Sequence, residues 1–177
     1  YMTRAQEGLA RLTQILTRMT EAARLEQGLS EVETERFDLV PVIAGCVGGY
    51  RLAYPQADLR LDSVDTPLMI TGAPDLVAQM LDKLVANAVE FAHGGQIDVR
   101  LDAAGDAARL AVANVGPPLP EGMRERLFES MVSVRAGGDA GTPHLGLGLY
   151  IVRVIAQFHG GAVRADNRTD AEGVVIT

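Results

Sequence analysis

A glycine-punctuated turn near the end of the chain leads directly into an apolar helical run. The segment reads HLGLGLYIV over residues 144–152. A helix that begins in small residues leaves its first backbone N–H groups open, and the positive end of the helix dipole lies beside them. Such a turn favours phosphate binding. It is neither a dinucleotide-binding fingerprint, because Ile151 replaces the third glycine, nor a Walker loop, because Gly-Lys-Ser/Thr is absent.

An amide side chain interrupts a second apolar helical run. Asn87 lies within LVANA, residues 84–88, where an amide without a partner would cost about 1–3 kcal/mol. A metal ion or a phosphate would serve as its partner, since a carboxamide oxygen is a hard ligand suited to Mg²⁺. The structural alternative is a bond to a neighbouring backbone group. Lys83 and Glu90 share the same strip of the helix surface, so the three residues form a polar edge.

Between these two helical runs, a strand-like run ends in NVGPP, residues 114–118. Asn114 offers a donor and an acceptor to the edge of a base, and Gly116 would let a flat ring approach the backbone. The structural alternative is a plain strand-to-loop turn. Three such elements in this order favour nucleotide binding.

Composition limits the classes of function. The chain has 177 residues, which is enough for one ordinary domain with an appendage, and its 47% hydrophobic and 22% charged content indicates a folded, soluble protein. A net charge of −7 argues against a broad nucleic-acid or anionic-membrane surface. The single cysteine, Cys46, is interpreted as a small buried hydrophobe. No run approaches the roughly 18 apolar residues of a membrane span.

The first residues form a predicted amphipathic helix. Its apolar stripe repeats in steps of three and four and contains Leu9, Leu12, Leu16, Met19 and Ala23. No second long helix of this kind follows. The stripe therefore lies either on the rest of this domain or, as we favour, against a partner that is outside the chain or in a second chain. The charged segment from Glu31 to Arg36 is interpreted as a hinge or linker.

The rest of the chain alternates helices with pairs of strands. Helices are predicted over residues 39–54, 75–92 and 148–158, and strands over 59–61, 68–70, 96–101, 109–115, 162–165 and 174–176. A long connection, 117–143, includes a short amphipathic piece at 123–128. This pattern predicts an α+β, two-layer α/β sandwich with a mixed sheet, helices on one face and a long N-terminal helix before it.

These elements resemble the sequence boxes of bacterial sensor histidine kinases. LVANA resembles their N box, NVGPP their first glycine box, LFE (127–129) their F box and GLGL (146–149) their second glycine box, while HGG (159–161) resembles the end of the helix that follows. Residues 1–30 then resemble the second helix of the dimerisation and phosphoacceptor hairpin. Residues 31–37 would be a linker, and 38–177 the ATP-binding catalytic domain with its last strand cut short. GPPLP (116–120) and MVSVR (131–135) resemble a proteobacterial subgroup tied to dedicated sortase systems.

The resemblance implies a Bergerat-type ATP-binding fold, shared with gyrase, Hsp90 and MutL, and ATP and Mg²⁺ as its cofactors. Asn87 would hold Mg²⁺, Asn114 would meet the adenine amino group, Gly146 and Gly148 would flank the phosphates, and residues 120–145 would be the ATP lid. The remaining expected nucleotide contacts are Lys83, Glu90, Phe91, Gly116, Arg135, His144, Leu145, Leu147 and Leu149.

Several positions depart from the family pattern, with consequences for affinity more than for fold. Asn114 stands where the family usually has aspartate. The asparagine keeps a hydrogen-bond acceptor but lacks the negative charge. Glu90 stands where the family often has a lysine that reaches phosphate. Lys83 stands where a second asparagine is common, and because it is one helical turn from Asn87 it could restore the positive charge. The other two departures replace glycines, at Pro118 and His144.

The phosphoacceptor histidine of the family is expected upstream of this chain. None of the three histidines lies in a His-Glu-hydrophobic-Arg context; His93 is interpreted as an exposed cap and His159 as structural. No catalytic residue is therefore assigned here. The resemblance implies that the full protein transfers the γ-phosphoryl of ATP to its own histidine and then to a response regulator. It further implies a homodimer, a cytoplasmic position for this domain, no nucleic-acid partner, and anchorage in the bacterial inner membrane through segments outside this chain.

Two other functions compete with this one. A degenerate nucleotide-binding module or non-catalytic scaffold, acting through partner contacts, is favoured by the departures and opposed by Asn87 and the glycine pair. A gyrase- or MutL-like ATPase would need a glutamate one turn before Asn87, where Lys83 stands.

Overall fold

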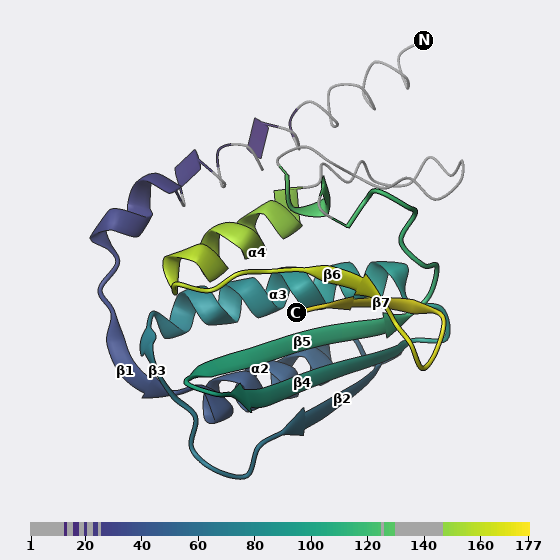
Figure 1. The fold of residues 1–177 in the computed structure, drawn as a ribbon, viewed down its shortest axis with the longest axis horizontal. Coiled ribbons are helices and arrows are strands. Elements are labelled where there is room, and N and C mark those ends of the chain that lie inside the picture. The colour runs from purple at the N-terminus through teal and green to yellow at the C-terminus, as the bar shows by residue number, and fades with distance from the viewer. Residues whose placement is uncertain are drawn as a thin grey trace.

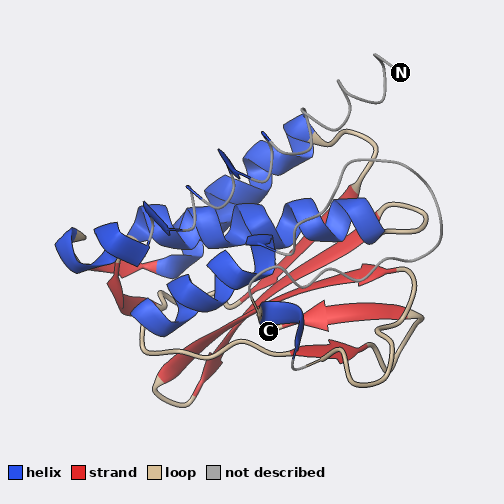
Figure 2. Ribbon diagram, turned by 90° about the horizontal axis from the view of Figure 1, so that it is seen from above, coloured by secondary structure: helices blue, strands red, loops and turns tan. Residues whose placement is uncertain are grey.

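The computed structural model of the chain describes residues 13, 16, 17, 20, 23, 24, 26–124, 126–129 and 147–177. Within them, helices form one layer and a five-stranded sheet the other, with the helices on one face of the sheet (Figure 1 and Figure 2). The helices are α2 (Leu39–Ala53), α3 (Pro74–Phe91), α4 (Leu147–Phe158) and the short 3₁₀ turns η1 (Leu29–Glu31) and η2 (Arg126–Phe128). The predicted two-layer α+β sandwich is confirmed.

The main sheet has the strand order β2-β4-β5-β7-β6, and β1 and β3 form a separate antiparallel pair. The strands are β1 (Glu35–Asp38), β2 (Asp58–Ser63), β3 (Met69–Gly72), β4 (Gln96–Ala104), β5 (Ala107–Val115), β6 (Ala165–Asn167) and β7 (Gly173–Ile176). Strands β2 and β4 run parallel while the other neighbours in the main sheet run antiparallel, so the sheet is mixed, as predicted.

Local signals explain where two of the helices begin. The Asp38 carboxylate accepts the Val40 N–H at 3.1 Å and caps α2, and it also accepts the Leu68 N–H at 2.9 Å from the chain that enters β3. Pro41 is tolerated because it falls in the first turn of α2. Pro74 opens α3 for the same reason.

At two places the structure differs from the elements predicted from the sequence. The segment interpreted as a linker over residues 31–37 includes the last residue of η1 and most of β1, whose residues Glu35 and Asp38 pair with Gly72 and Met69. The strand predicted at 162–165 is instead β6, which begins at Ala165 opposite Ile176. In both places the hydrophobic pattern is too short to set a register, and the pairing partner sets it.

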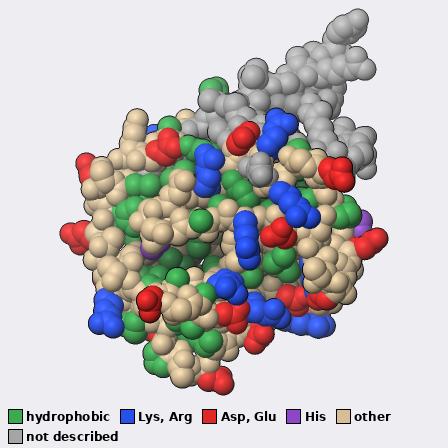
Figure 3. Space-filling view, viewed as in Figure 1, with side chains coloured by type: hydrophobic (Ala, Val, Ile, Leu, Met, Phe, Trp, Pro, Cys, Tyr) green, Lys and Arg blue, Asp and Glu red, His purple; other side chains and the backbone are tan. Residues whose placement is uncertain are grey.

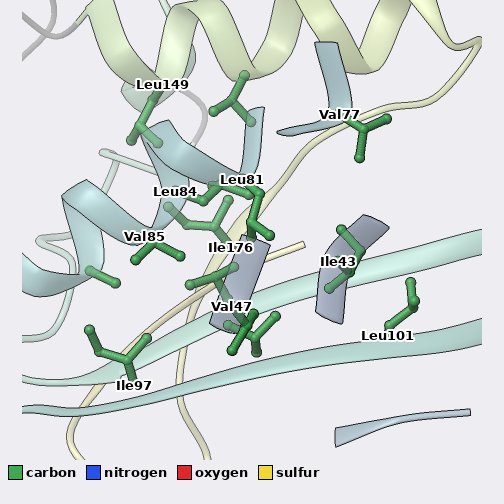
Figure 4. Close-up of a cluster of buried hydrophobic side chains, with 14 of the residues drawn as sticks. Ile43, Val47, Val77, Leu81, Leu84, Val85, Ile97, Leu101, Leu149 and Ile176 are labelled. Atoms are coloured by element: carbon green, nitrogen blue, oxygen red, sulfur yellow. The ribbon is translucent and has the colours of Figure 1, made fainter. Parts of the chain in front are cut away.

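The main core lies between the sheet and helices α2 and α3, with the first turn of α4 closing one end (Figure 4). Alternate residues of β4 face the helices and are fully buried, as are the inward residues of α2 and α3. The largest fully buried side chains are Ile43, Val47, Leu81, Val85, Ile97, Val99, Leu101, Val152 and Ile155.

A second, smaller cluster joins α3 to α4 and receives the end of the N-terminal segment. Its buried members are Ala73, Leu76, Leu147, Ile151 and Ile155. Leu29 and Val32 pack against this cluster, and nearby the Tyr150 hydroxyl donates a hydrogen bond to the Glu26 carboxylate, which raises the pKa of Tyr150. The segment that enters the domain is therefore docked on α4.

The predicted N-terminal stripe is described at two positions. Leu16, with 64% of its surface exposed, and Ala23 both face solvent. Leu9, Leu12 and Met19 lie outside the described residues. At Leu16 the stripe does not lie on the rest of this domain; a partner outside the chain remains a prediction.

The sheet face away from the helices carries a ladder of charges. Opposite charges stand directly across from each other on neighbouring strands, as Arg60 does with Asp98, and Figure 3 shows both signs interspersed on the visible face.

Arg168, whose side chain is 9% exposed, donates to Asp98 at 3.0 Å and to Asp170 at 2.9 Å. This guanidinium lowers the pKa of Asp170 to about 2. The pair's stabilisation is therefore complete above the ordinary carboxyl pKa of 3.8 and is lost as pH falls through about 2.

No helix among the described residues is both long and apolar enough to cross a membrane.

Candidate nucleotide-binding site

The described residues of the predicted site lie on three elements that are neighbours in the fold. In Figure 1 the C-terminal part of α3 and the end of β5 lie toward the right, and α4 begins above α3, near the middle of the view. α3 packs against both α4 and β5, so the three sequence elements that are far apart along the chain become neighbours. Leu76, Leu84 and Ala88 hold α3 in place because their side chains are buried, as the helical spacing predicted.

Asn87 lies on the partly exposed edge of α3. It is half-buried, and its polar atoms are not sealed in the core. Over the part of the chain that the structure describes, its side chain makes no hydrogen bond, so the backbone partner considered as an alternative is not found. Its carboxamide oxygen is therefore open to a ligand.

The two charged neighbours of Asn87 lie on the same helix. Lys83 is half-buried, with its ammonium 4.0 Å from the Asp82 carboxylate, and Glu90 is exposed. On α3, the positive charge nearest to Asn87 belongs to Lys83, one helical turn away. Glu90 extends the polar edge toward the end of α3.

Asn114 is the one charged or polar residue buried among those described, with 4% of its surface exposed. Its Nδ2 donates a long hydrogen bond to the Val115 carbonyl at 3.5 Å. It stands on β5 between Ile97 of β4 and Val174 of β7, in the interior of the sheet. A buried amide with one weak internal bond is available to a hydrogen-bonding ligand.

Gly116 is needed for close packing within the protein itself. A Cβ there would lie 2.2 Å from the Phe91 carbonyl oxygen and 3.0 Å from the Asn114 Nδ2. The end of α3 therefore gives Gly116 a packing role, and the approach of a flat ring to its backbone stays a prediction. The backbone N–H of His93 strengthens the same junction by donating a hydrogen bond to the Val115 carbonyl at 2.7 Å. Phe91, Asn114 and Gly116 therefore form one contact group.

The first turn of α4 divides its residues between the core and the site. Leu147 and Leu149 are buried, so a nucleotide would meet them through their backbone. Gly148 is half-buried, and a Cβ there would have no atom of the described residues within 4 Å. Packing by the part of the chain that the structure describes does not require glycine at this helical position, where glycine costs about 0.5–1 kcal/mol relative to alanine. The vacant volume beside a helix start suits a phosphate.

Replacing Gly148 by alanine should therefore move stability and binding in opposite directions. We expect the free energy of unfolding to rise by about 0.5–1 kcal/mol, because alanine favours the helix and meets no neighbour in the described part of the chain. Binding of an ATP analogue should weaken by about tenfold, because the methyl group occupies the phosphate volume. Urea unfolding and titration calorimetry measure the two effects. Unchanged affinity in the stabilised variant would show that Gly148 is not at the phosphates.

Four of the predicted contacts, Arg135, His144, Leu145 and Gly146, lie outside the described residues. The other two histidines behave as predicted. His93 is exposed, and His159 is structural: its Nε2 accepts the Ala73 N–H at 3.1 Å, and its Nδ1 lies 2.8 Å from the Ile155 carbonyl oxygen.

Sequence reasoning missed the support that the β6–β7 hairpin gives to this end of the domain. The Gly116 N–H donates to the Glu172 carbonyl at 3.2 Å, and Gly173 passes so close to Asn114 that a Cβ would lie 2.0 Å from its carbonyl oxygen. Asn167 bonds the backbone of Leu119. The only signal for these contacts is the spacing of Gly173 before the last strand, which also reads as an ordinary turn.

The fold is a two-layer α+β domain in which the end of α3, the end of β5 and the start of α4 are neighbours. Residues 72–177 match the family model described as histidine kinase-, DNA gyrase B-, and HSP90-like ATPase, and the chain belongs to this family. Sensor protein ChvG of Agrobacterium fabrum is 29% identical over 93% of this chain and 29% of its own length. The chain thus spans less than a third of that relative.

Solved structures agree with this assignment. The catalytic domain of histidine kinase ThkA matches with a TM-score of 0.69 and 26% identity over 82% of this chain and 93% of that domain. Full-length ShkA, solved in complex with AMPPNP, matches with a TM-score of 0.73 and 25% identity over 99% of this chain and 37% of its own. The chain is the ATP-binding catalytic domain of a sensor histidine kinase, and these relatives favour it over the scaffold and the gyrase-like alternatives.

Proposed function

We propose that the end of α3, the end of β5 and the first turn of α4 hold Mg²⁺-ATP, and that the full protein passes the γ-phosphoryl to a histidine outside this chain. A response-regulator aspartate would then receive the phosphoryl group. The observation that carries the proposal is the volume beside Gly148, a helical glycine whose added Cβ would meet no atom among residues 26–124, 126–129 and 147–177. The share of this chain in the chemistry is positioning and charge neutralisation.

The residues present fit a magnesium ion bound together with phosphate. Among the described residues, no group of three or more His, Cys, Asp or Glu side chains could form a protein cage for a metal. Mg²⁺ in nucleotide sites commonly takes one or two protein oxygens and completes its shell with phosphate and water. The open carboxamide oxygen of Asn87 suits that role. When bound, the ion neutralises phosphate charge.

The adenine and phosphate ends would be held by different elements. The Asn114 Oδ1 would accept a hydrogen bond from the adenine amino group. Burial strengthens such a bond because water does not compete for it. The first turn of α4 would direct its N–H groups and dipole at the phosphates, beside Gly148. Lys83 would contribute a positive charge on the α3 side. Arg135, His144, Leu145 and Gly146 remain proposed contacts.

The partners follow from the relatives. Histidine kinase ThkA has been solved in complex with the response regulator protein TrrA, which supports a response regulator as partner here. The exposed Leu16 supports a helix–helix contact of the N-terminal segment in a homodimer of the full protein. We place the domain in the cytoplasm, on a parent anchored in the bacterial inner membrane by segments outside this chain. Membership of the subgroup tied to dedicated sortase systems stays a prediction.

Phosphoryl transfer is tested on the chain extended by its upstream hairpin helix. We expect label from ATP radiolabelled on the γ-phosphoryl to appear on the extended protein and to disappear when the upstream histidine is replaced by glutamine. Calorimetry with Mg²⁺ and a non-hydrolysable ATP analogue is run in parallel. Binding without labelling would favour the scaffold function, and absence of binding would refute the proposed site.

A further inference from the structure

The segment that leaves β5 has only two backbone donors, and both end on the β6–β7 hairpin. Residues 116–120 read GPPLP, and proline has no N–H. The Gly116 N–H donates to the Glu172 carbonyl at 3.2 Å, and the Leu119 N–H donates to the Asn167 Oδ1 at 2.6 Å. The hairpin therefore controls where this segment runs.

Asn167 holds Leu119 from both sides. In addition to accepting the Leu119 N–H, its Nδ2 donates to the Leu119 carbonyl at 3.3 Å. A carboxamide has the donor and acceptor of a peptide group, so the pair reproduces the two bonds that a strand residue would make. Because both residues are half-buried, the bonds are partly protected from water. The side chain thus fixes both the position and the orientation of the Leu119 backbone.

The link from Leu119 back to Asn114 is stiff. Pro117 and Pro118 have fixed φ angles and restrict the residue before each of them, so a shift at Leu119 is passed on to Gly116 instead of being absorbed. Gly116 in turn lies directly against the Asn114 amide, since a Cβ added to Gly116 would lie 3.0 Å from the Asn114 Nδ2.

The strand itself does not require asparagine at this position. Asparagine is disfavoured in strands. Asn167 pairs with Val174, and a β-branched residue in place of Asn167 would pack well against that valine. The neighbouring contact, from Arg124 to Asp166 at 3.2 Å, joins two exposed side chains and adds little. Asn167 is therefore the principal side-chain tie between β6 and this segment.

We propose that Asn167 is a positioning residue that sets the base selectivity of the nucleotide site. It acts through Leu119 and Gly116 to hold Asn114 where its oxygen accepts the amino group of adenine. This inference rests on the proposed function. It predicts selectivity because guanine carries a carbonyl oxygen where adenine carries that amino group, and the Asn114 Nδ2, the group that could donate to that oxygen, is turned toward the Val115 carbonyl.

The test compares Asn167→Ala with Thr169→Ala, a matched change at an exposed residue of the same hairpin. Titration calorimetry with Mg²⁺ measures Kd for a non-hydrolysable ATP analogue and for the corresponding GTP analogue. We expect Asn167→Ala to weaken binding of the ATP analogue about tenfold, as the loss of one or two hydrogen bonds predicts, and to leave the GTP analogue within about twofold. Thr169→Ala should leave both values unchanged.

Asn167→Asp provides a second variant should the alanine variant not fold. It keeps the acceptor for the Leu119 N–H and loses the donor to the Leu119 carbonyl, so we expect a smaller loss for the ATP analogue with the same selectivity. In the wild type, the Leu119 amide should be protected from hydrogen exchange, and both variants should lower that protection.

The outcomes separate this inference from the proposed function. Equal weakening of both analogues would reveal a merely structural role and overturn the inference. Unchanged affinity in a folded Asn167 variant, while Asn114→Ala loses the ATP analogue, would overturn it and leave the proposed site standing. A wild-type chain that binds no nucleotide would refute the proposed function, and this inference with it.

Discussion

Asn87→Ala should lower the affinity for a Mg²⁺-bound ATP analogue by at least about a hundredfold, because it removes the one protein oxygen proposed to contact the ion. The fold should not suffer. The side chain makes no hydrogen bond within the described residues, and alanine is the better helix former by a few tenths of a kcal/mol. We therefore expect an equal or slightly higher midpoint of thermal unfolding together with the loss of binding measured by calorimetry.

Removal of magnesium provides the control for this prediction. With a chelator present, the wild-type affinity should fall to that of Asn87→Ala, and the variant itself should change little, since both changes remove the same interaction. Gln79→Ala, at a half-buried amide two turns earlier on α3, should keep wild-type affinity and magnesium dependence. If Asn87→Ala weakened binding equally with and without magnesium, Asn87 would not be the metal ligand.

Gly173→Ala should cost the largest free energy of unfolding of the substitutions considered, more than about 3 kcal/mol. The Gly173 φ of 144° disfavours a side chain, and a Cβ would lie 2.0 Å from the backbone oxygen of Asn114. Neither group can yield without separating β7 from β5. Because a domain of this kind has only about 5–15 kcal/mol in total, a large part of its stability would be lost.

Gly105→Ala separates the clash from the backbone strain. Gly105 also has a positive φ, 64°, in the turn between β4 and β5, but a Cβ there would meet no atom within 4 Å. We expect this variant to lose only about 1 kcal/mol. Urea unfolding followed by circular dichroism measures both. Similar losses in the two variants would mean that the contact with Asn114 is not what requires glycine at 173.

Elements with local punctuation were predictable. The helix predicted over 75–92 is α3 at Pro74–Phe91, because a proline in its first turn and the glycines at 94 and 95 mark its two ends. The hairpin around Gly105 was also predicted, although its strands extend further toward the turn than expected. Turn chemistry and periodicity act over a few residues, so the sequence carries them directly.

Contacts between distant segments were not predictable. The charged residues of β1 gave no strand pattern, and β1 exists because β3 pairs with it. The same holds for Gly116. From the sequence it could serve either a ligand or a turn, and the decisive neighbour, the Phe91 carbonyl, is 25 positions away along the chain. Leu147 and Leu149 looked like ligand contacts, and packing turned their side chains into the core.

By itself, the sequence determined the class of fold and the order of its nucleotide-binding elements, because helix starts, apolar periodicity and the amide and glycine positions are local properties of the chain. Only the tertiary structure decided which glycines serve packing, as Gly116 and Gly173 do, and which, like Gly148, have no neighbour among the described residues. It also decided that the β6–β7 hairpin supports the turn at Asn114. Those outcomes depend on which backbones approach each other across the fold, and hydrogen bonds and close contacts between them are set by the packing of the whole domain.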